Sequence, residues 1–135
     1  MSAQKHLIYV MCLLFVALGI SCTSNRSSEV KVVTTEEMQS LLEMEDVQLV
    51  DVRSPEEFKT GFIKGAQNID YRSSTFEEDI LKLDKNKPVI LYCKEGGRSS
   101  KCAKKMAEAG FVKIYDLDGG ITQWQFEELD VEIIK

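Results

Sequence analysis

The chain has 135 residues, of which 44% are hydrophobic, and a formal net charge of -5. This length suits one globular domain and is too short for two ordinary ones. Its lysines are interspersed with Asp and Glu, a pattern that argues against a nucleic-acid-binding surface. The single histidine is His6, near the N-terminus.

The N-terminal segment has the pattern of an export signal. A short basic start precedes 14 mostly apolar residues, 7–20, fewer than the ~18 of a membrane-spanning helix. Gly19 and Ser21 are small residues placed as at a cleavage site before Cys22. A cysteine in this place resembles the lipobox of bacterial lipoproteins, although Gly19 stands where that family usually has leucine.

These features predict how the chain is divided. We expect residues 1–21 to be a lipoprotein-type signal peptide, residues 22–29 a polar tether and residues 30–135 the folded domain. A lipidated Cys22 would anchor an exported protein to a bacterial membrane, facing the periplasm in a cell with two membranes. Ordinary secretion and an uncleaved anchor are the alternatives.

The first half of the domain opens with an apolar strand at residues 30–33. Thr34 and Glu37 then have capping-box spacing at the start of a helix. Residues 47–52 are a second strand, and Pro55 stands at the first position of the next helix.

The second half continues the alternation. Residues 66–69 are a third strand, and residues 76–83 carry the apolar side of another helix. Residues 88–92 are a fourth strand, followed by a helix over 99–109 and a fifth strand over 112–115.

The C-terminal segment holds the last elements. Gly119 and Gly120 open a short segment whose Trp124 is expected in the core, and residues 131–134 are expected to return as an edge strand. Continuous apolar strands separated by helices predict an α/β domain with a mostly parallel sheet and helices on both faces.

Cys93 lies where the fourth strand gives way to a helix. Unpaired N–H groups and the positive end of a helix dipole favour a thiolate there. Gly96 and Gly97 allow a tight loop. Because the domain has no histidine, a catalytic Cys93 must be activated by loop amides, the dipole and nearby cations such as Lys94 and Arg98. A buried structural cysteine is the alternative.

Cys102 is the second cysteine of the domain. It shares a helical face with Met106, which favours a core position. The alternative is a resolving thiol that pairs with Cys93 in an oxidising compartment.

Three motifs occur in order. Residues 51–69 (DVRSPEEFKTGFIKGAQNI) resemble the first signature of the rhodanese-like domain, residues 93–99 (CKEGGRS) its active-site loop, and residues 117–124 (LDGGITQW) its closing signature. The resemblance covers about residues 30–134 and is nearest to exported single-domain sulfurtransferases. One departure is Phe62, where the family commonly has histidine.

The resemblance implies a five-stranded parallel sheet and a Cys93 that cycles through a persulfide. Sulfur would come from a small anionic donor such as thiosulfate and pass to cyanide, a thiol or a protein thiol, with no metal or organic cofactor. The persulfide would be held by the loop residues Lys94, Glu95, Gly96, Gly97, Arg98 and Ser99.

Three charged residues are candidates for supporting the pocket or the loop: Asp51, Arg53 and Glu57. Arg98 either steers the anionic donor or holds the loop against an acid such as Glu57 or Asp51. Asp51 ends a strand beside the site, where it also suits a turn cap. Arg53 is expected at the pocket rim, at the surface or in an ion pair.

Other functions stay open from the sequence. A non-catalytic rhodanese-like binding module typically lacks the cysteine. Phosphatases and arsenate reductases on related folds place five residues between cysteine and arginine, whereas only four separate Cys93 from Arg98. A thiol-disulfide role has no C-x-x-C pair to support it.

Overall fold

The computed structural model describes residues 27–44 and 46–135. The predicted signal peptide, Cys22 and most of the tether lie outside these residues. The elements, in chain order, are β1 (Glu29–Val33), α2 (Thr35–Met44), β2 (Gln48–Asp51), α3 (Pro55–Thr60), β3 (Gln67–Asn68), α4 (Phe76–Ile80), β4 (Val89–Tyr92), α5 (Gly97–Glu108), β5 (Lys113–Leu117) and α6 (Gly120–Phe126).

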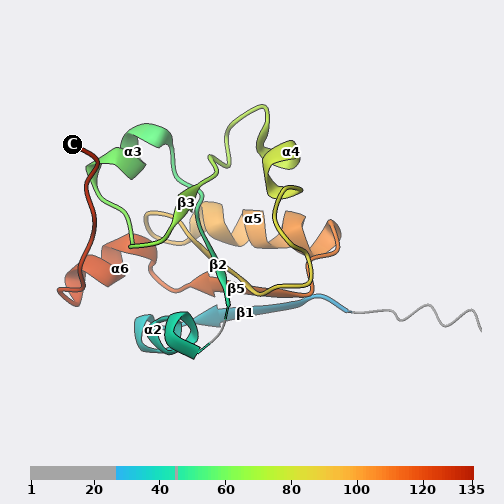
Figure 1. The fold of residues 1–135 in the computed structure, drawn as a ribbon, viewed down its shortest axis with the longest axis horizontal. Helices are drawn as coiled ribbons and strands as arrows, with labels where there is room; N and C mark the ends of the chain where they lie inside the picture. Colours follow the sequence, from blue (N-terminus) through green and yellow to red (C-terminus); the bar gives the residue numbers. More distant parts are fainter. Residues whose placement is uncertain (1–26, 45) are drawn as a thin grey trace, which may run out of the picture.

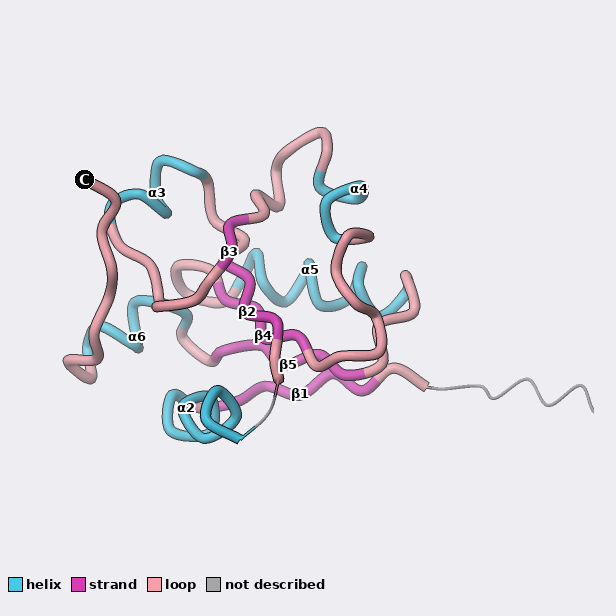
Figure 2. The backbone as a smooth tube through the Cα atoms, in the orientation of Figure 1, coloured by secondary structure: helices cyan, strands magenta, loops and turns pink. Residues whose placement is uncertain are grey.

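The strands form one sheet in the order β1-β5-β4-β2-β3, and every pairing is parallel. This confirms the predicted α/β class, and the sheet is wholly rather than mostly parallel. Figure 2 shows the strands in magenta at the centre of the domain, with the helices in cyan around them. β4 is flanked on both sides, and all four of its residues are buried. The continuous apolar run of this strand is therefore explained by its central position.

Helices cover both faces of the sheet (Figure 1). On one face, α4 and α5 contribute Phe76, Cys102 and Met106 to a core cluster with β2 and β4. On the other face, α2 and α6 contribute Met38 and Trp124 to a second cluster. Trp124 is buried as expected, and its indole N–H donates to the Asp130 carbonyl at 3.0 Å.

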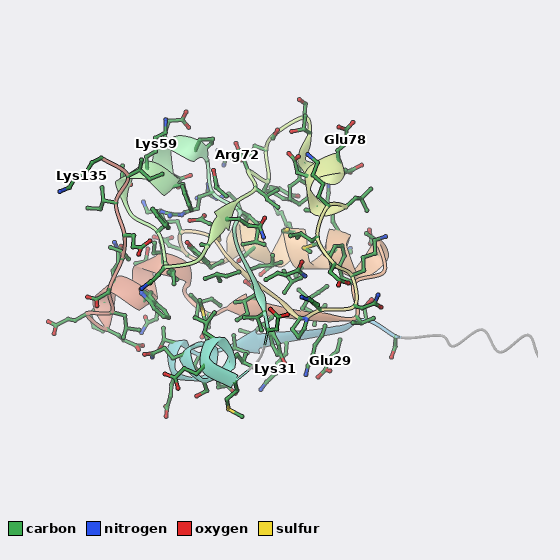
Figure 3. All side chains as sticks on the ribbon, in the orientation of Figure 1. Glu29, Lys31, Lys59, Arg72, Glu78 and Lys135 are labelled. Carbon is green, nitrogen blue, oxygen red and sulfur yellow. The ribbon has the colours of Figure 1, made fainter. Side chains whose placement is uncertain are left out.

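Charged side chains lie around this core. Figure 3 shows Lys59, Glu78 and Lys135 at the periphery of the molecule, pointing away from the sheet. No helix within residues 27–44 and 46–135 is long and apolar enough to cross a membrane.

Two helix starts follow the sequence signals. Thr34 and Glu37 exchange the two hydrogen bonds of a capping box, at 3.0 and 3.2 Å. Ser54 caps α3 in the same way with Glu57, and Pro55 is the first residue of that helix. α5 begins at Gly97, two residues earlier than predicted, because Gly96 takes a left-handed conformation (φ 118°) that turns the chain directly into the helix.

The predicted edge strand at residues 131–134 is wrong. In its place is a single antiparallel bridge between Phe62 and Glu132. Phe62 lies in the connection between α3 and β3, so it offers no strand along which pairing could continue. Ile133 and Ile134 are left exposed.

Candidate active site

The loop between β4 and α5 carries Cys93 at the carboxyl edge of the sheet. The Gly96 N–H donates to the Cys93 sulfur at 3.0 Å, and the Ser99 hydroxyl lies 3.4 Å from it. Gly96 adopts φ 118°, which lets the loop fold back so that this N–H meets the sulfur. The Cys93 side chain is thus placed beside loop donors at the start of a helix.

The electrostatics of Cys93 favour the thiolate. Burial raises the pKa of the thiol, since Cys93 is only 1% exposed. The Ser99 hydroxyl and the N–H groups of Ser99, Gly96 and Glu95 act in the opposite direction by stabilising the negative charge. Their combined effect is larger, so the pKa of Cys93 lies below the ordinary value for cysteine.

The first turn of α6 donates two backbone hydrogen bonds to the Cys93 loop. Ile121 N–H donates to the Cys93 carbonyl at 2.9 Å, and Thr122 N–H donates to the Lys94 carbonyl at 3.0 Å. These N–H groups belong to the first turn of the helix and have no partner inside it. Both carbonyls therefore face α6, and the Glu95 N–H, which shares a peptide unit with the Lys94 carbonyl, points to the opposite side, where it stabilises the thiolate.

Gly120 makes this contact possible. A Cβ atom at this position would lie 2.5 Å from the Cys93 oxygen and 2.6 Å from the Lys94 oxygen. Gly120 also has φ 58°, in the left-handed region that favours glycine. The closing signature thus works as a backbone clamp on the Cys93 loop, a role that its sequence did not indicate.

Arg98 is held by Glu57, one of the two acids considered from the sequence. Its guanidinium binds both carboxylate oxygens, at 2.6 and 2.7 Å. Glu57 also caps α3, so this one side chain joins α3 to the first turn of α5. Arg98 lowers the pKa of Glu57 to about 2.

Asp51 and Arg53 form a buried ion pair. Their side chains are 0% and 6% exposed, and Arg53 Nη2 lies 2.5 Å from Asp51 Oδ2. Asp51 Oδ1 also accepts from the Arg53 backbone N–H at 2.9 Å, which is the turn cap expected of it. Arg53 Nη2 further donates to the Gly61 carbonyl at 2.6 Å. The surface position considered for Arg53 is therefore wrong, because this pairing buries it.

A polar cavity of about 230 Å³ adjoins the loop. Its lining includes Arg53, Glu57 and Lys94, with Thr122 and Gln125 from α6. A larger hollow of about 600 Å³ lies between β1 and α2 and contains none of the loop residues, so its size does not make it the site. Within residues 27–44 and 46–135, no group of three His, Cys, Asp or Glu side chains could hold a metal ion.

Cys102 is a buried core residue of α5, as its helical face predicted. Both Cys93 and Cys102 are free thiols in the structure. Burial, followed by the charge of Asp116, raises the pKa of Cys102 to about 12. A thiol with this pKa is a poor candidate for a resolving nucleophile.

Sequence reasoning missed Asp116, whose buried carboxyl accepts a hydrogen bond from the Ser100 hydroxyl at 2.8 Å. Asp116 lies in β5 among apolar residues. A charged residue inside an otherwise apolar strand is the signal that could have revealed it.

Replacing Gly120 by alanine should loosen the loop. We expect Gly120→Ala to lower the free energy of unfolding by more than ~1 kcal/mol and to slow alkylation of Cys93 at neutral pH, measured by mass spectrometry. Gly65→Ala is the matched control, since Gly65 also has a left-handed φ but nothing within 4 Å of its added Cβ. Equal effects of the two substitutions on Cys93 alkylation would argue against the clamp.

The Glu57–Arg98 pair should make the free energy of unfolding depend on pH in the acid range. The folded-state pKa of Glu57 is about 2, below the ~4.3 of an unfolded chain. Its stabilising effect is therefore present above pH ~5 and lost as the pH falls toward 2. In Glu57→Gln the free energy of unfolding should fall less over this pH interval than in the wild type, as measured by urea denaturation at several pH values. Glu56→Gln, on the same turn, is the control, and an unchanged acid slope in Glu57→Gln would contradict the assignment.

Comparison with known proteins matches the fold and the loop to one family. The Rhodanese-like domain family matches residues 34–127. YqhL of Bacillus subtilis, an uncharacterised protein, is 31% identical over 90% of this chain and 93% of its own length. The thiosulfate sulfurtransferase GlpE of Ectopseudomonas mendocina is 34% identical over 73% of this chain and 87% of its own. A rhodanese-like domain protein of Staphylococcus aureus superposes with a TM-score of 0.68 at 31% identity, covering 78% and 99% of the two chains. The chain therefore belongs to the rhodanese-like family.

Proposed function

We propose that the protein is a sulfurtransferase that carries sulfane sulfur as a persulfide on Cys93. The observation that carries this proposal is the set of donors around the Cys93 sulfur, namely Gly96 N–H and the Ser99 hydroxyl. These groups stabilise negative charge on sulfur without a histidine or a metal. The name of the GlpE relative supports the same chemistry.

Sulfur is loaded in the first half of the reaction. The Cys93 thiolate attacks the outer sulfur of a donor such as thiosulfate, forming a new S–S bond. The S–S bond of thiosulfate breaks, and its electron pair leaves with sulfite. The negative charge of the product lies on the outer sulfur of the persulfide, within reach of the loop amides.

Sulfur is delivered in the second half. Cyanide or a thiolate attacks the outer sulfur, and the Cys93–sulfur bond breaks with its electron pair returning to Cys93. The enzyme is then ready for another donor, so the two substrates react in separate steps with ping-pong kinetics.

The contacts of Arg98 weigh against a phosphatase. A phosphatase loop uses its arginine to bind the equatorial oxygens of a phosphoryl group. Here both terminal nitrogens of the Arg98 guanidinium already donate to the Glu57 carboxylate. The loop also has only four residues between Cys93 and Arg98.

Thiosulfate should add one sulfur atom to the protein, detected as a mass increase of the intact chain. Cyanide should then remove the sulfur as thiocyanate. Cys93→Ser should reduce thiocyanate formation to background, because the nucleophile is lost while the side-chain shape is nearly kept. Cys102→Ser is the matched control and should retain most of the activity.

Two outcomes would overturn this function. One is thiocyanate formation that Cys93→Ser leaves unchanged. The other is release of phosphate from an aryl phosphate by the wild type, lost in Cys93→Ser, which would make the protein a phosphatase.

We also propose that the domain is exported and anchored through an acylated Cys22. This rests on the sequence of residues 1–22, which lie outside the described part of the chain. Several acyl chains give stable membrane attachment, whereas a single chain binds only marginally. A tether at residues 22–29 would then hold the domain close to the membrane surface.

Metabolic labelling with a fatty acid, followed by fractionation, tests the anchor. The wild type should be labelled and found with membranes, and Cys22→Ala should lose the label. Cys12→Ala, in the segment expected to be removed, is the matched control and should keep it. An unlabelled wild type in the soluble cytoplasmic fraction would refute the proposal.

A further inference from the structure

Asp116 lies on the face of the sheet that carries the Cys93 sulfur. It pairs in register with Leu91 of β4, and both Leu91 and Cys93 belong to the core cluster under α5. Asp116 is only 4% exposed. The carboxyl group is therefore held inside the layer between the sheet and the active-site helix.

The hydrogen bonds of this carboxyl are incomplete. Oδ2 accepts from the Ser100 hydroxyl at 2.8 Å, whereas Oδ1 has no hydrogen-bond partner among the described residues. Ser99, next to Ser100 in α5, donates its hydroxyl to the Gly96 carbonyl at 3.1 Å, and this hydroxyl lies 3.4 Å from the Cys93 sulfur. Two adjacent serines thus lie beside the carboxyl and the sulfur.

No cation balances Asp116 in the described part of the chain, where none of the ion pairs includes it. Burial raises the pKa of Asp116, the hydroxyls of Ser99 and Ser100 lower it, and the charge of Asp118 raises it. On the same side, the pKa of Cys102 in α5 is raised by burial and then by the charge of Asp116, whereas Lys105 lowers it. Asp116 is thus close enough to act on one neighbouring sulfur.

We propose that the Asp116 carboxylate is a positioning residue that disfavours a bare thiolate on Cys93 and thereby keeps transferable sulfur on the protein. The proposal rests on the proposed sulfurtransferase function. In the persulfide the negative charge lies on the outer sulfur, one S–S bond beyond the inner sulfur. With the outer sulfur directed away from Asp116, repulsion between like charges is weaker in the loaded protein than in the empty one.

Two consequences for the reaction follow. A cysteine whose thiolate is less stable is a stronger nucleophile, so each thiolate accepts sulfur faster. The same cysteine is a poorer leaving group, so the persulfide loses its sulfur more slowly. Fewer thiolates are present when the pKa of Cys93 is higher, so Asp116 slows attack by Cys93 at low pH, whereas it stabilises the loaded form and lengthens the life of the persulfide.

The test measures Cys93 in its empty and loaded forms. Alkylation of the empty protein across pH, read by mass spectrometry, gives the pKa of Cys93. Asp116→Asn should lower this pKa and speed alkylation at pH 6 by roughly threefold to tenfold, as expected for removal of one nearby charge. Loss of persulfide sulfur to cyanide should also be faster than in the wild type. Asp118→Asn removes an exposed carboxylate two residues away and should change neither quantity.

Ser100→Ala separates charge from anchoring, because it removes the hydrogen bond to Asp116 but keeps the carboxylate. Because loss of this hydrogen bond raises the pKa of Asp116 without removing the carboxyl group, Ser100→Ala should lower the pKa of Cys93 less than Asp116→Asn does. A Cys93 pKa that is unchanged in Asp116→Asn, or lowered equally by Ser100→Ala, would overturn the proposal.

Two further points keep the test decisive. If Asp116→Asn does not fold, Asp116→Val removes the charge with a side chain of similar size and no polar atom, and the same shift is expected. If thiosulfate fails to load even the wild type, the proposed function fails, while the alkylation data still decide whether Asp116 acts on Cys93.

Discussion

Two hydrogen bonds from the first turn of α6 to the carbonyls of Cys93 and Lys94 fix the direction in which the cysteine loop faces. A trans peptide unit has its N–H opposite its carbonyl, so holding the Lys94 carbonyl against α6 turns the Glu95 N–H, one of the groups that stabilise the thiolate, to the other side. Gly120 allows the contact because any side chain there would meet both oxygens. The thiolate-favouring environment of Cys93 therefore depends on a segment more than twenty residues farther along the chain.

Two ion pairs connect the elements that surround this loop. Glu57 joins α3 to α5 through Arg98, and Asp51 joins the end of β2 to the end of α3 through Arg53 and the Gly61 carbonyl. The first pair is partly exposed, and the second is buried. Removing one partner of a buried pair leaves an unpaired charge, which typically costs ~3–5 kcal/mol. α3 is thus held to the sheet and to the active-site helix by charges at both of its ends.

The fold could be read from the sequence because its signals are local. Apolar runs mark the three inner strands β2, β4 and β5. Capping boxes mark the starts of α2 and α3, and the Cys93 loop falls at a strand-to-helix junction. Contacts between segments distant in the sequence could not be read in this way. The choice of Glu57 as the partner of Arg98, the clamp from α6 and the burial of Asp116 depend on which helix lies against which strand end. The edge strand expected at residues 131–134 failed for the same reason, since strand formation needs a neighbouring edge as well as an apolar pattern.

The loop draws its contacts to the Cys93 sulfur largely from peptide N–H groups, which every residue type except proline supplies. The exposed side chains of Lys94 and Glu95 are not needed for those contacts. These two positions can therefore be redesigned to change the charge that an approaching substrate meets, while the sulfur keeps its backbone donors. In the proposed sulfurtransferase, chemistry and selectivity would be carried by different parts of the same short segment, which makes the loop a practical starting point for engineering new acceptors.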